Sequence, residues 1–421
     1  MKDFSDKVAA AHRLLGEVVA ATPFQHNLFL SEKHGARIYL KREDLTPVRS
    51  YKIRGAFTFF ADVLAGNDPP QRFACASAGN HAQGFAFACR HFGKQGVVFM
   101  PVTTPRQKIM KTEVFGGDNV EIRLIGDSFD ESYAEASRWC AREGAVLVPP
   151  FDDERIVTGQ ATVAREIVDQ FAESGTDGKI DLVLLPVGGG GLAAGVTRYF
   201  AENSPETEFV FVEPDGAPSL HESLKAGRRV VLDQIDNFVD GAAVAQIGEF
   251  NFESLKHFSV GQTVLAPTDG VCATMLELLN HEGIVLEPAG ALSVDALKRV
   301  PAEKLAGKNV VCITSGGNFD FERLPEVKER ALKYSGLKKY FILRMPQRPG
   351  ALKDFLFMLE PEDDIARFEY LKKSARNFGS VLIGIETTKP ENFNKLKAKL
   401  AESGMRFQDI TDNDILASLV V

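Results

Sequence analysis

The segment "DLVLLPVGGGGLAAGVTRYF" (residues 181–200) joins an apolar run typical of a buried strand, four consecutive glycines and the start of a helical pattern. Glycine inside a helix or strand costs about 0.5–1 kcal/mol, so a run of glycines indicates a backbone that curls tightly. A loop without side chains at a helix N-terminus presents several N–H groups and the positive end of a dipole. The segment therefore predicts either a phosphate-binding loop or a tight crossover from strand to helix.

A dinucleotide-binding fold is a rival interpretation of the same segment. Gly189, Gly191 and Gly195 nearly form the pattern GxGxxG. Glu213 ends the next strand about 20 residues further on, where an acid that binds a ribose would lie. The fit is imperfect, because Gly195 falls one position late and the motif lies in the middle of the chain.

Strand and helix patterns alternate from residue 37 to about residue 320. The strand-like runs are "ARIYL", "RFACAS", "QGVVFM", "VEIRLIG", "AVLVPP", "DLVLLPV", "EFVFVEP" and "NVVCITSGG". Such alternation predicts parallel sheets with helices on both faces. Because this is many strands for one small sheet, we expect two α/β lobes with a cleft between them. The smaller lobe, about residues 50–150, would be inserted in the larger one.

Two further strands end in small or polar residues. "CASAGNHAQG" (residues 75–84) and "CITSGGNFD" (residues 312–320) could each be a simple helix cap or turn. Because α/β sheets bind ligands where their strands end, these segments and the glycine loop can meet in one crevice.

A lysine precedes an apolar helix in "DLTPVRSYKIRGAF" (residues 44–57). Alone, Lys52 fits a solvated lysine in a first helical turn. With the glycine loop, the amide of Asn80 and the hydroxyl of Ser315, it completes the parts that hold pyridoxal phosphate. The lysine would form the Schiff base and the glycine loop would bind the phosphate. The amide would contact the ring oxygen and the hydroxyl the ring nitrogen.

The pattern changes after a charged helix at residues 321–336, which we expect to be a connector. Residues 337–421 read as strand, helix, two strands, helix and strand, which predicts a separate α+β domain of the ferredoxin-like βαββαβ type. The preceding residues 1–320 would form the first domain.

Composition narrows the possible functions. A net charge of −8 argues against nucleic-acid binding, and no apolar run approaches a membrane span. Five scattered cysteines without a CxxC pair favour a reducing compartment, so we expect a cytoplasmic protein. The eight histidines show no HxxxH or HExxH spacing, so no metal is expected.

Five motifs together resemble the fold type II (tryptophan synthase β-like) family of pyridoxal-phosphate enzymes, and within it the threonine dehydratases. They are "KREDLTPVRSYKIRGAF", "SAGNHAQG", "PVGGGGLAAG", "LEPAGA" and "TSGGN", in the order of the family. The resemblance implies that Lys52 forms the Schiff base, Asn80 contacts the ring oxygen and Ser315 bonds the pyridine nitrogen. It implies a phosphate cradle of Gly188, Gly189, Gly190, Gly191 and Leu192. The substrate carboxylate would be received by Ser77, Ala78, Gly79, Asn80 and His81.

The implied reaction is α,β-elimination of L-threonine to 2-oxobutanoate and ammonia, the first step of isoleucine biosynthesis. Lys52 would need a depressed pKa, and a neutral Ser315 favours prompt loss of the hydroxyl over a long-lived carbanion. Ala78 stands where similar serine racemases have a second serine, so racemisation is not expected. Ser219 stands where some relatives have a metal-binding acid, so a metal is not expected there either.

The C-terminal βαββαβ pattern is similar to the ACT-like regulatory domain of biosynthetic threonine dehydratases, in a single copy. It implies allosteric control by isoleucine, possibly valine, and a homo-oligomer, as a tetramer. Three other functions stay open: a catabolic L-serine/L-threonine dehydratase, an amino-acid sensor on a lyase-like fold, and an NAD-dependent dehydrogenase. The small domain could also serve only packing or dimerisation.

Overall fold

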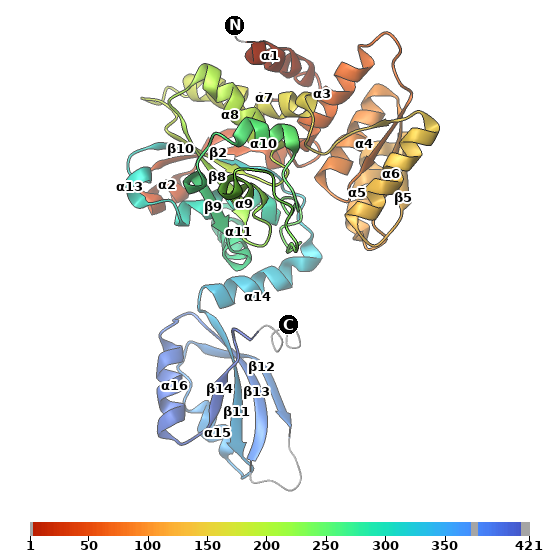
Figure 1. Ribbon diagram of the computed structural model, residues 1–421. Coiled ribbons are helices and arrows are strands. Elements are labelled where there is room, and N and C mark those ends of the chain that lie inside the picture. Colours follow the sequence, from red (N-terminus) through yellow and green to blue (C-terminus); the bar gives the residue numbers. More distant parts are fainter. Residues whose placement is uncertain (1–2, 372–377, 414–421) are drawn as a thin grey trace. The chain divides into compact units, whose positions relative to one another are not determined.

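The structure of the protein is a computed structural model, which describes residues 3–371 and 378–413. It divides into two compact units, Met1–Thr268 with Ile284–Asp320, and Asp269–Gly283 with Phe321–Val421. The first unit holds two sheets and the second unit holds one (Figure 1). Within the described residues, no helix is both long enough and apolar enough to cross a membrane.

The large sheet of the first unit has six strands in the order β1-β2-β10-β7-β8-β9. All neighbours are parallel except β1, which is antiparallel to β2. The strands are β1 (Phe24–His26), β2 (Arg37–Arg42), β7 (Leu182–Pro186), β8 (Glu208–Pro214), β9 (Thr263–Ala266) and β10 (Asn309–Thr314). The parallel strands all end at one edge of the sheet, which places the segments that follow them close together.

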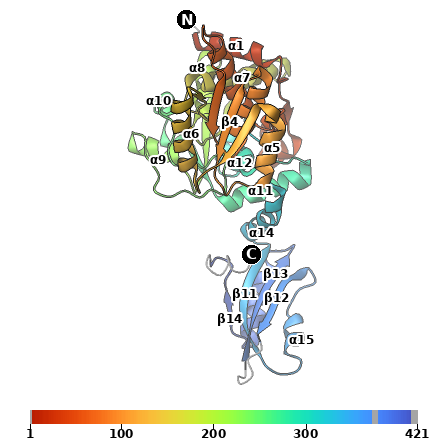
Figure 2. The same cartoon turned by 90° about the vertical axis from the view of Figure 1, so that its right-hand side faces the viewer.

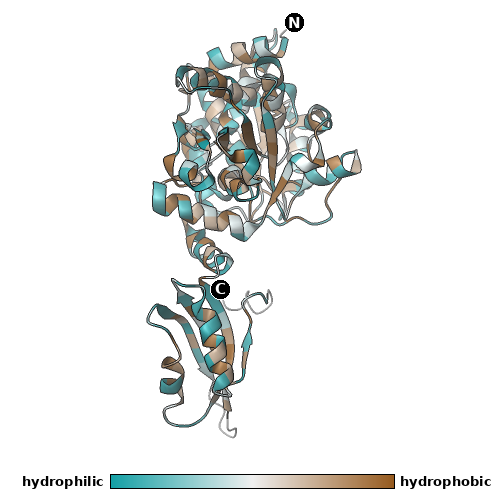
Figure 3. Cartoon of the chain, turned by 90° about the vertical axis from the view of Figure 1, so that its left-hand side faces the viewer, coloured by the Kyte–Doolittle hydropathy of each residue, from teal (hydrophilic) through white to brown (hydrophobic). Residues whose placement is uncertain are grey.

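Helices cover both faces of the large sheet. Val183 and Leu185 of β7 pack with α1, α7 and α8 on one face, while α12 packs on the other face. The strands are mostly apolar along their length, as expected for strands buried on both faces (Figure 3). The helices around this sheet are α1 (Asp3–Leu15), α2 (Leu28–His34), α7 (Glu154–Glu173), α8 (Gly191–Asn203), α9 (Ser219–Ala226), α10 (Glu249–Leu255), α12 (Pro288–Asp295) and α13 (Ala302–Leu305).

The small sheet has four parallel strands in the order β5-β4-β3-β6. The strands are β3 (Arg72–Ala76), β4 (Gln95–Met100), β5 (Val120–Leu124) and β6 (Val146–Leu147). Helices α4 (Asn80–Phe92) and α5 (Arg106–Gly116) lie on one side, and α6 (Phe129–Glu143) lies on the other. Figure 2 shows α5 and α6 on opposite sides of β4. Phe73 and Val98 pack on the α4 side, and Phe99 packs with Trp139 on the α6 side.

Helix α3 (Lys52–Leu64) joins the two sheets, because it packs against both α7 and α4. Two glycines permit this close packing. A Cβ added at Gly159 of α7 would lie 2.4 Å from the carbonyl oxygen of Arg54, and one at Gly84 of α4 would lie 3.1 Å from the nitrogen of Ile53. The backbone around Lys52 is therefore held from two sides.

Arg54, in the first turn of α3, lies at the centre of a buried group of charges. It donates two hydrogen bonds to Glu43, at 2.7 and 2.9 Å, and two to Glu166, at 2.7 and 2.9 Å. Lys41 donates to the same Glu166 at 2.6 Å, and all four side chains are at most 3% exposed. Burial opposes ionisation of Glu166, but Arg54 and Lys41 outweigh it and lower its pKa to about 2. Two basic and two acidic side chains are thus paired with one another in this buried cluster.

The second unit contains a four-stranded antiparallel sheet in the order β12-β13-β11-β14. Phe341, Ile383 and Phe393 lie in its core, between the sheet and helices α15 and α16. Arg330 of α14 pairs with Asp269 of α11 at 2.8 Å. The elements are α11 (Thr268–Glu282), α14 (Leu324–Tyr334), β11 (Lys338–Pro346), α15 (Ala351–Leu356), β12 (Asp363–Leu371), β13 (Phe378–Thr387), α16 (Asn392–Glu402) and β14 (Phe407–Asp409).

The predicted fold class is confirmed: a two-sheet α/β part and a βαββαβ part. The expected strands of the α/β part are all present, and the sequence patterns missed the short strands β1 and β9. Lys372 and Lys373 of the expected strand "IARFEYLKK", and residues 414–421 of the expected small domain, lie outside the described residues.

Replacing Arg54 by alanine should lower the free energy of unfolding by about 3–5 kcal/mol, because Glu43 and Glu166 would stay buried without their shared partner. Arg138→Ala is the control, since its pair with Glu135 is exposed and should change stability by less than about 1 kcal/mol. Urea denaturation followed by circular dichroism measures both. Equal losses in the two variants would show that the buried cluster does not stabilise the fold.

Candidate active site

Segments that are far apart in the sequence meet where the parallel strands end. The backbone N–H of Tyr51 donates to the carbonyl oxygen of Ser315 at 3.2 Å, and Ser50 pairs with Gly316 in an isolated antiparallel bridge. These contacts place the start of α3 beside the end of β10. The side-chain contacts of Lys52 and Asn80, described below, bring in the remaining segments.

Lys52 is the first residue of α3, and its amine faces residues 150 and 151. The Nζ atom donates to the carbonyl oxygen of Pro150 at 2.8 Å and lies 5.8 Å from the ring centroid of Phe151. Burial disfavours the charged amine and lowers its pKa to about 8, although the nearby Glu287 acts in the opposite direction. About a tenth of the amine is therefore uncharged, and nucleophilic, at pH 7, far more than for an ordinary lysine.

The glycine loop forms an uncapped helix N-terminus. Gly190 is the N-cap of α8, with a φ of +88°, and makes no side-chain capping bond. Among the residues that the structure describes, no acceptor binds the backbone N–H groups of residues 188–193. A Cβ at Gly189 would lie 2.2 Å from the ring of Phe151, so this position must be glycine. Unsatisfied N–H groups at a helix N-terminus bind anions, and the loop therefore fits a phosphate.

Phe151 and Asn251 support this loop. The Nδ2 atom of Asn251 donates to the carbonyl oxygens of Gly189 and Phe151, at 2.7 and 3.1 Å. The ring of Phe151 lies against Gly189 and its backbone packs against Gly191, while the amine of Lys52 donates to the neighbouring Pro150. Lys52 and the glycine loop thus border the same short stretch of chain.

The loop after β3 holds Ser77, Ala78, Gly79 and Asn80, all of them half-buried. The backbone N–H of Gly79 donates to the Oγ atom of Ser77 at 3.2 Å, and a Cβ at Gly79 would meet no atom within 4 Å. His81 differs, because its ring is buried and its Nε2 atom lies 3.1 Å from the carbonyl oxygen of Val148. Burial and the charge of Lys52 lower the pKa of His81 to about 3, so its ring is neutral. The open part of the loop is therefore residues 77–80.

Ser315 follows β10 and is buried, and its hydroxyl donates to the carbonyl oxygen of Ala289 at 3.2 Å. A hydroxyl rotates freely about its C–O bond, so the same group can donate to a ring nitrogen instead. The residues present thus fit pyridoxal phosphate: an amine of lowered pKa, an anion-binding turn and a neutral hydroxyl.

Three polar residues of the site were not predicted from the sequence: Glu287, Asn318 and Lys111. Asn80 donates through Nδ2 to Glu287 at 2.6 Å and accepts from Asn318 at 2.8 Å. Lys111 of α5 donates to Asn318 at 3.2 Å. The motifs "LEPAGA" and "TSGGN" contain Glu287 and Asn318 and could have indicated them, whereas nothing in the sequence around Lys111 does.

Glu213 does not lie free at the end of its strand. Its two carboxylate oxygens accept the backbone N–H groups of Leu220 and His221, at 2.7 and 2.8 Å, and so cap α9. Burial raises the pKa of Glu213 to about 8. Ser219 lies in the same turn, with its Oγ atom 3.5 Å from Glu213. The ribose-binding role considered for Glu213 has no support, because both oxygens are engaged.

Comparison with known proteins agrees with this geometry. Residues 16–316 match the family model of pyridoxal-phosphate dependent enzymes, and residues 329–420 match the C-terminal regulatory domain of threonine dehydratase. The chain is 44% identical over 417 residues to the biosynthetic L-threonine dehydratase of Halalkalibacterium halodurans, covering 99% of each chain. It is 45% identical over 415 residues to the Bacillus subtilis enzyme of the same description, covering 98% of this chain and 96% of that one.

Among solved structures, the processed form of threonine deaminase isoform 2 from Solanum lycopersicum is similar, with a TM-score of 0.72 and 36% identity. The match covers 78% of this chain and 92% of that chain. Fold and site together define a pyridoxal-phosphate-dependent enzyme. More narrowly, the chain belongs to the family of biosynthetic threonine dehydratases. The predicted family, enzyme class and cofactor are confirmed.

The lowered pKa of Lys52 predicts how cofactor uptake depends on pH. Between pH 7 and pH 9 the uncharged fraction of an amine with a pKa of about 8 rises about tenfold and then levels off. The rate at which cofactor-free protein takes up pyridoxal phosphate, measured by stopped-flow absorbance, should follow this curve. N-α-acetyl-lysine is the control and should show a rise of about a hundredfold, because its amine has an ordinary pKa. A hundredfold rise in the protein would contradict the lowered pKa.

Proposed function

We propose that this protein deaminates L-threonine to 2-oxobutanoate and ammonia by α,β-elimination, as the first step of isoleucine biosynthesis. The observation that carries the proposal is the placement of the Lys52 amine beside an uncapped glycine turn, with a neutral hydroxyl at the end of β10. The full-length match to relatives described as biosynthetic L-threonine dehydratases supports the choice of substrate and pathway.

In this proposal each segment of the site has one task. When bound, the cofactor withdraws electrons from the α-carbon of the substrate. Residues 188–192 would bind its phosphate through backbone N–H groups, while Asn80 would contact its ring oxygen and Ser315 its ring nitrogen. Lys52 would hold the cofactor through its amine, and its Nζ atom would accept the α-proton of the substrate. The open loop at residues 77–80, next to the buried His81, receives the substrate carboxylate.

A catabolic L-serine/L-threonine dehydratase is the second candidate. The match of residues 329–420 to a regulatory domain of threonine dehydratase favours the biosynthetic role. A biosynthetic enzyme should respond to the end product of its pathway, so the response to isoleucine distinguishes the two candidates.

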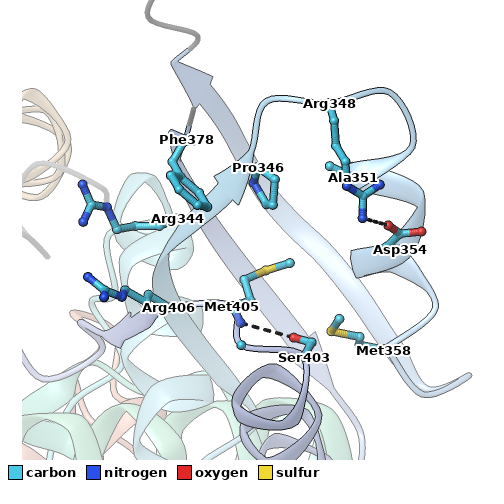
Figure 4. A pocket seen from close by; sticks show the side chains of 11 residues that line it. Arg344, Pro346, Arg348, Ala351, Asp354, Met358, Phe378, Ser403, Met405 and Arg406 are labelled. Atoms are coloured by element: carbon cyan, nitrogen blue, oxygen red, sulfur yellow. Dashed lines mark hydrogen bonds and ion pairs between the residues drawn. The ribbon is translucent and has the colours of Figure 1, made fainter. Parts of the chain in front are cut away.

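A pocket in the second unit offers a place for such an effector. It encloses about 510 Å³ between the end of β11, α15 and the turn before β14. Arg344 and Arg406 lie at one end, joined by a backbone hydrogen bond of 2.9 Å (Figure 4). The ion pair of Arg348 with Asp354 lies at the other end, at 2.6 Å, and Met405 lies between the two ends.

We propose that isoleucine or valine binds in this pocket. Arg344 and Arg406 line one end of the pocket and their guanidinium groups point outward in Figure 4, so either group would turn inward to pair with a carboxylate. Met358, Met405 and Ala351 supply an apolar lining for a branched side chain. Asp354 can accept a bond from the ammonium group, in exchange for part of its pairing with Arg348.

Other predictions from the sequence stay proposals. They are a catalytic domain of residues 1–320 with a small lobe at about residues 50–150, a connector at residues 321–336 and an ACT-like regulatory domain at residues 337–421. We also propose a cytoplasmic homotetramer that uses no metal. Gel filtration with light scattering measures the number of subunits.

Lys52→Ala should reduce production of 2-oxobutanoate by about a thousandfold or more and abolish the visible absorption band of the bound cofactor. Lys256→Ala, at an exposed helix end, is the control and should change neither. Circular dichroism checks that both variants are folded. A folded Lys52→Ala protein with normal turnover of threonine would remove Lys52 from the reaction.

Arg344→Ala and Arg406→Ala should each raise the isoleucine concentration for half-maximal response about tenfold or more, because each removes a charge-assisted bond to the effector carboxylate. Turnover without isoleucine should stay unchanged. Arg367→Ala is the control, since this arginine of β12 pairs with Glu369 and does not line the pocket. If both pocket variants keep the sensitivity of the unaltered protein, the effector binds elsewhere.

A further inference from the structure

Glu287 is a buried carboxyl group with a site built around it. It is the N-cap of α12 and only 6% exposed, and its backbone N–H donates to the carbonyl oxygen of Gly316 at 3.3 Å. A Cβ added at Gly316 would lie 2.1 Å from its Oε1 atom, and one added at Gly241 would lie 3.6 Å away. Glycine at position 316 thus makes room for this carboxyl group beside Ser315.

The contacts of Glu287 fix the orientation of Asn80. The Oδ1 atom of Asn80 accepts from Nδ2 of Asn318 at 2.8 Å, and its Nδ2 atom donates to Oε1 of Glu287 at 2.6 Å. Asn318 is itself held, because its Nδ2 also donates to the carbonyl oxygen of Val48 at 2.8 Å. A side-chain amide has two N–H bonds, so Asn80 keeps one of them for a further acceptor. An Asn80 rotated by 180° would place its carbonyl against Glu287.

We propose that Glu287 is a positioning residue, which acts through Asn80 to aim that second N–H at the ring oxygen of the bound cofactor and which changes the charge facing the oxygen when it ionises. The inference rests on the proposed contact of Asn80 with the cofactor. The site would thus contain a carboxyl group that gains and loses a proton but does not contact the reacting atoms.

The surroundings of Glu287 put its ionisation near neutral pH. Burial raises its pKa to about 7, and the charge of Asp240 acts in the same direction. The hydrogen bond from Asn80 and the charges of Lys108 and Lys111 on α5 lower it. The start of α3 also faces this carboxyl, through Tyr51 and Lys52. Lys108 forms an ion pair with Asp240, so the effects of these two charges on Glu287 act in opposite directions.

The test is a pH titration of the visible absorption band of the holoenzyme, without substrate. In the unaltered protein we expect a transition with a midpoint near pH 7. Glu287→Gln keeps an oxygen that can accept from Asn80 but cannot ionise, so the transition should disappear while the dissociation constant of the cofactor changes by less than about threefold. Glu213→Gln is the control, a second buried carboxyl of raised pKa, and should keep the transition.

Asn80→Ala gives a second test that does not depend on the folding of Glu287 variants. Because the hydrogen bond from Asn80 lowers the pKa of Glu287, its loss should move the midpoint upward by about half a unit or more.

Glu287→Ala, Asn80→Ala and the variant with both changes form a double-mutant cycle, in which the rate of cofactor dissociation is measured. If the two residues act as a unit, the double variant should release the cofactor no faster than Asn80→Ala alone.

Two outcomes would overturn the inference: a transition that persists in Glu287→Gln, or effects of the two alanine variants that simply add. Both outcomes are measured on the holoenzyme without substrate, so neither bears on whether the protein deaminates threonine. A protein that binds pyridoxal phosphate and shows these effects, yet produces no 2-oxobutanoate, would contradict the proposed function and support the role of Glu287.

Discussion

The buried contact between Arg54 and its two carboxylates is the interaction on which the site depends. Arg54 lies two residues after Lys52, in the same helical turn, whereas Glu43 comes from the turn after β2 and Glu166 from α7. A guanidinium group bonded on both sides allows little rotation of the helix that carries it. The direction of the Lys52 side chain is thus fixed by charges that never contact the substrate.

Burial shifts the pKa values of the ionisable groups of the site in different directions. Lys52 and His81 lose protons more readily because their charged forms are disfavoured, and Glu287 holds its proton more tightly for the same reason. By contrast, Glu166 lies as deep but remains ionised, because two cations bond to it. Burial with paired charges gives rigidity in this protein, whereas burial with few counter-charges lets Lys52 and Glu287 exchange protons near neutral pH.

Sequence patterns predicted the fold where the physical signal is local. The apolar runs of β7 and β10 and the glycines at residues 188–191 are recognisable because burial and tight turns restrict residue type at each position. Strands β1 and β9 have three and four residues, too few for a period to appear. The bonds of Arg54 to Glu166 and of Asn80 to Glu287 span 112 and 207 positions, and only the folded chain brings such partners together.

Because the turn before α8 is uncapped, the stability of the folded chain depends on the supply of the ligand that binds there. Without a bound phosphate, these N–H groups lose the partner that every helix end requires, and part of the driving force for folding is missing. A ligand that binds only the folded state adds stability in proportion to the logarithm of its concentration, about 2.7 kcal/mol at one hundred times its dissociation constant. A cell short of this vitamin-derived ligand would therefore lose enzyme molecules to proteolysis as well as catalytic turnover.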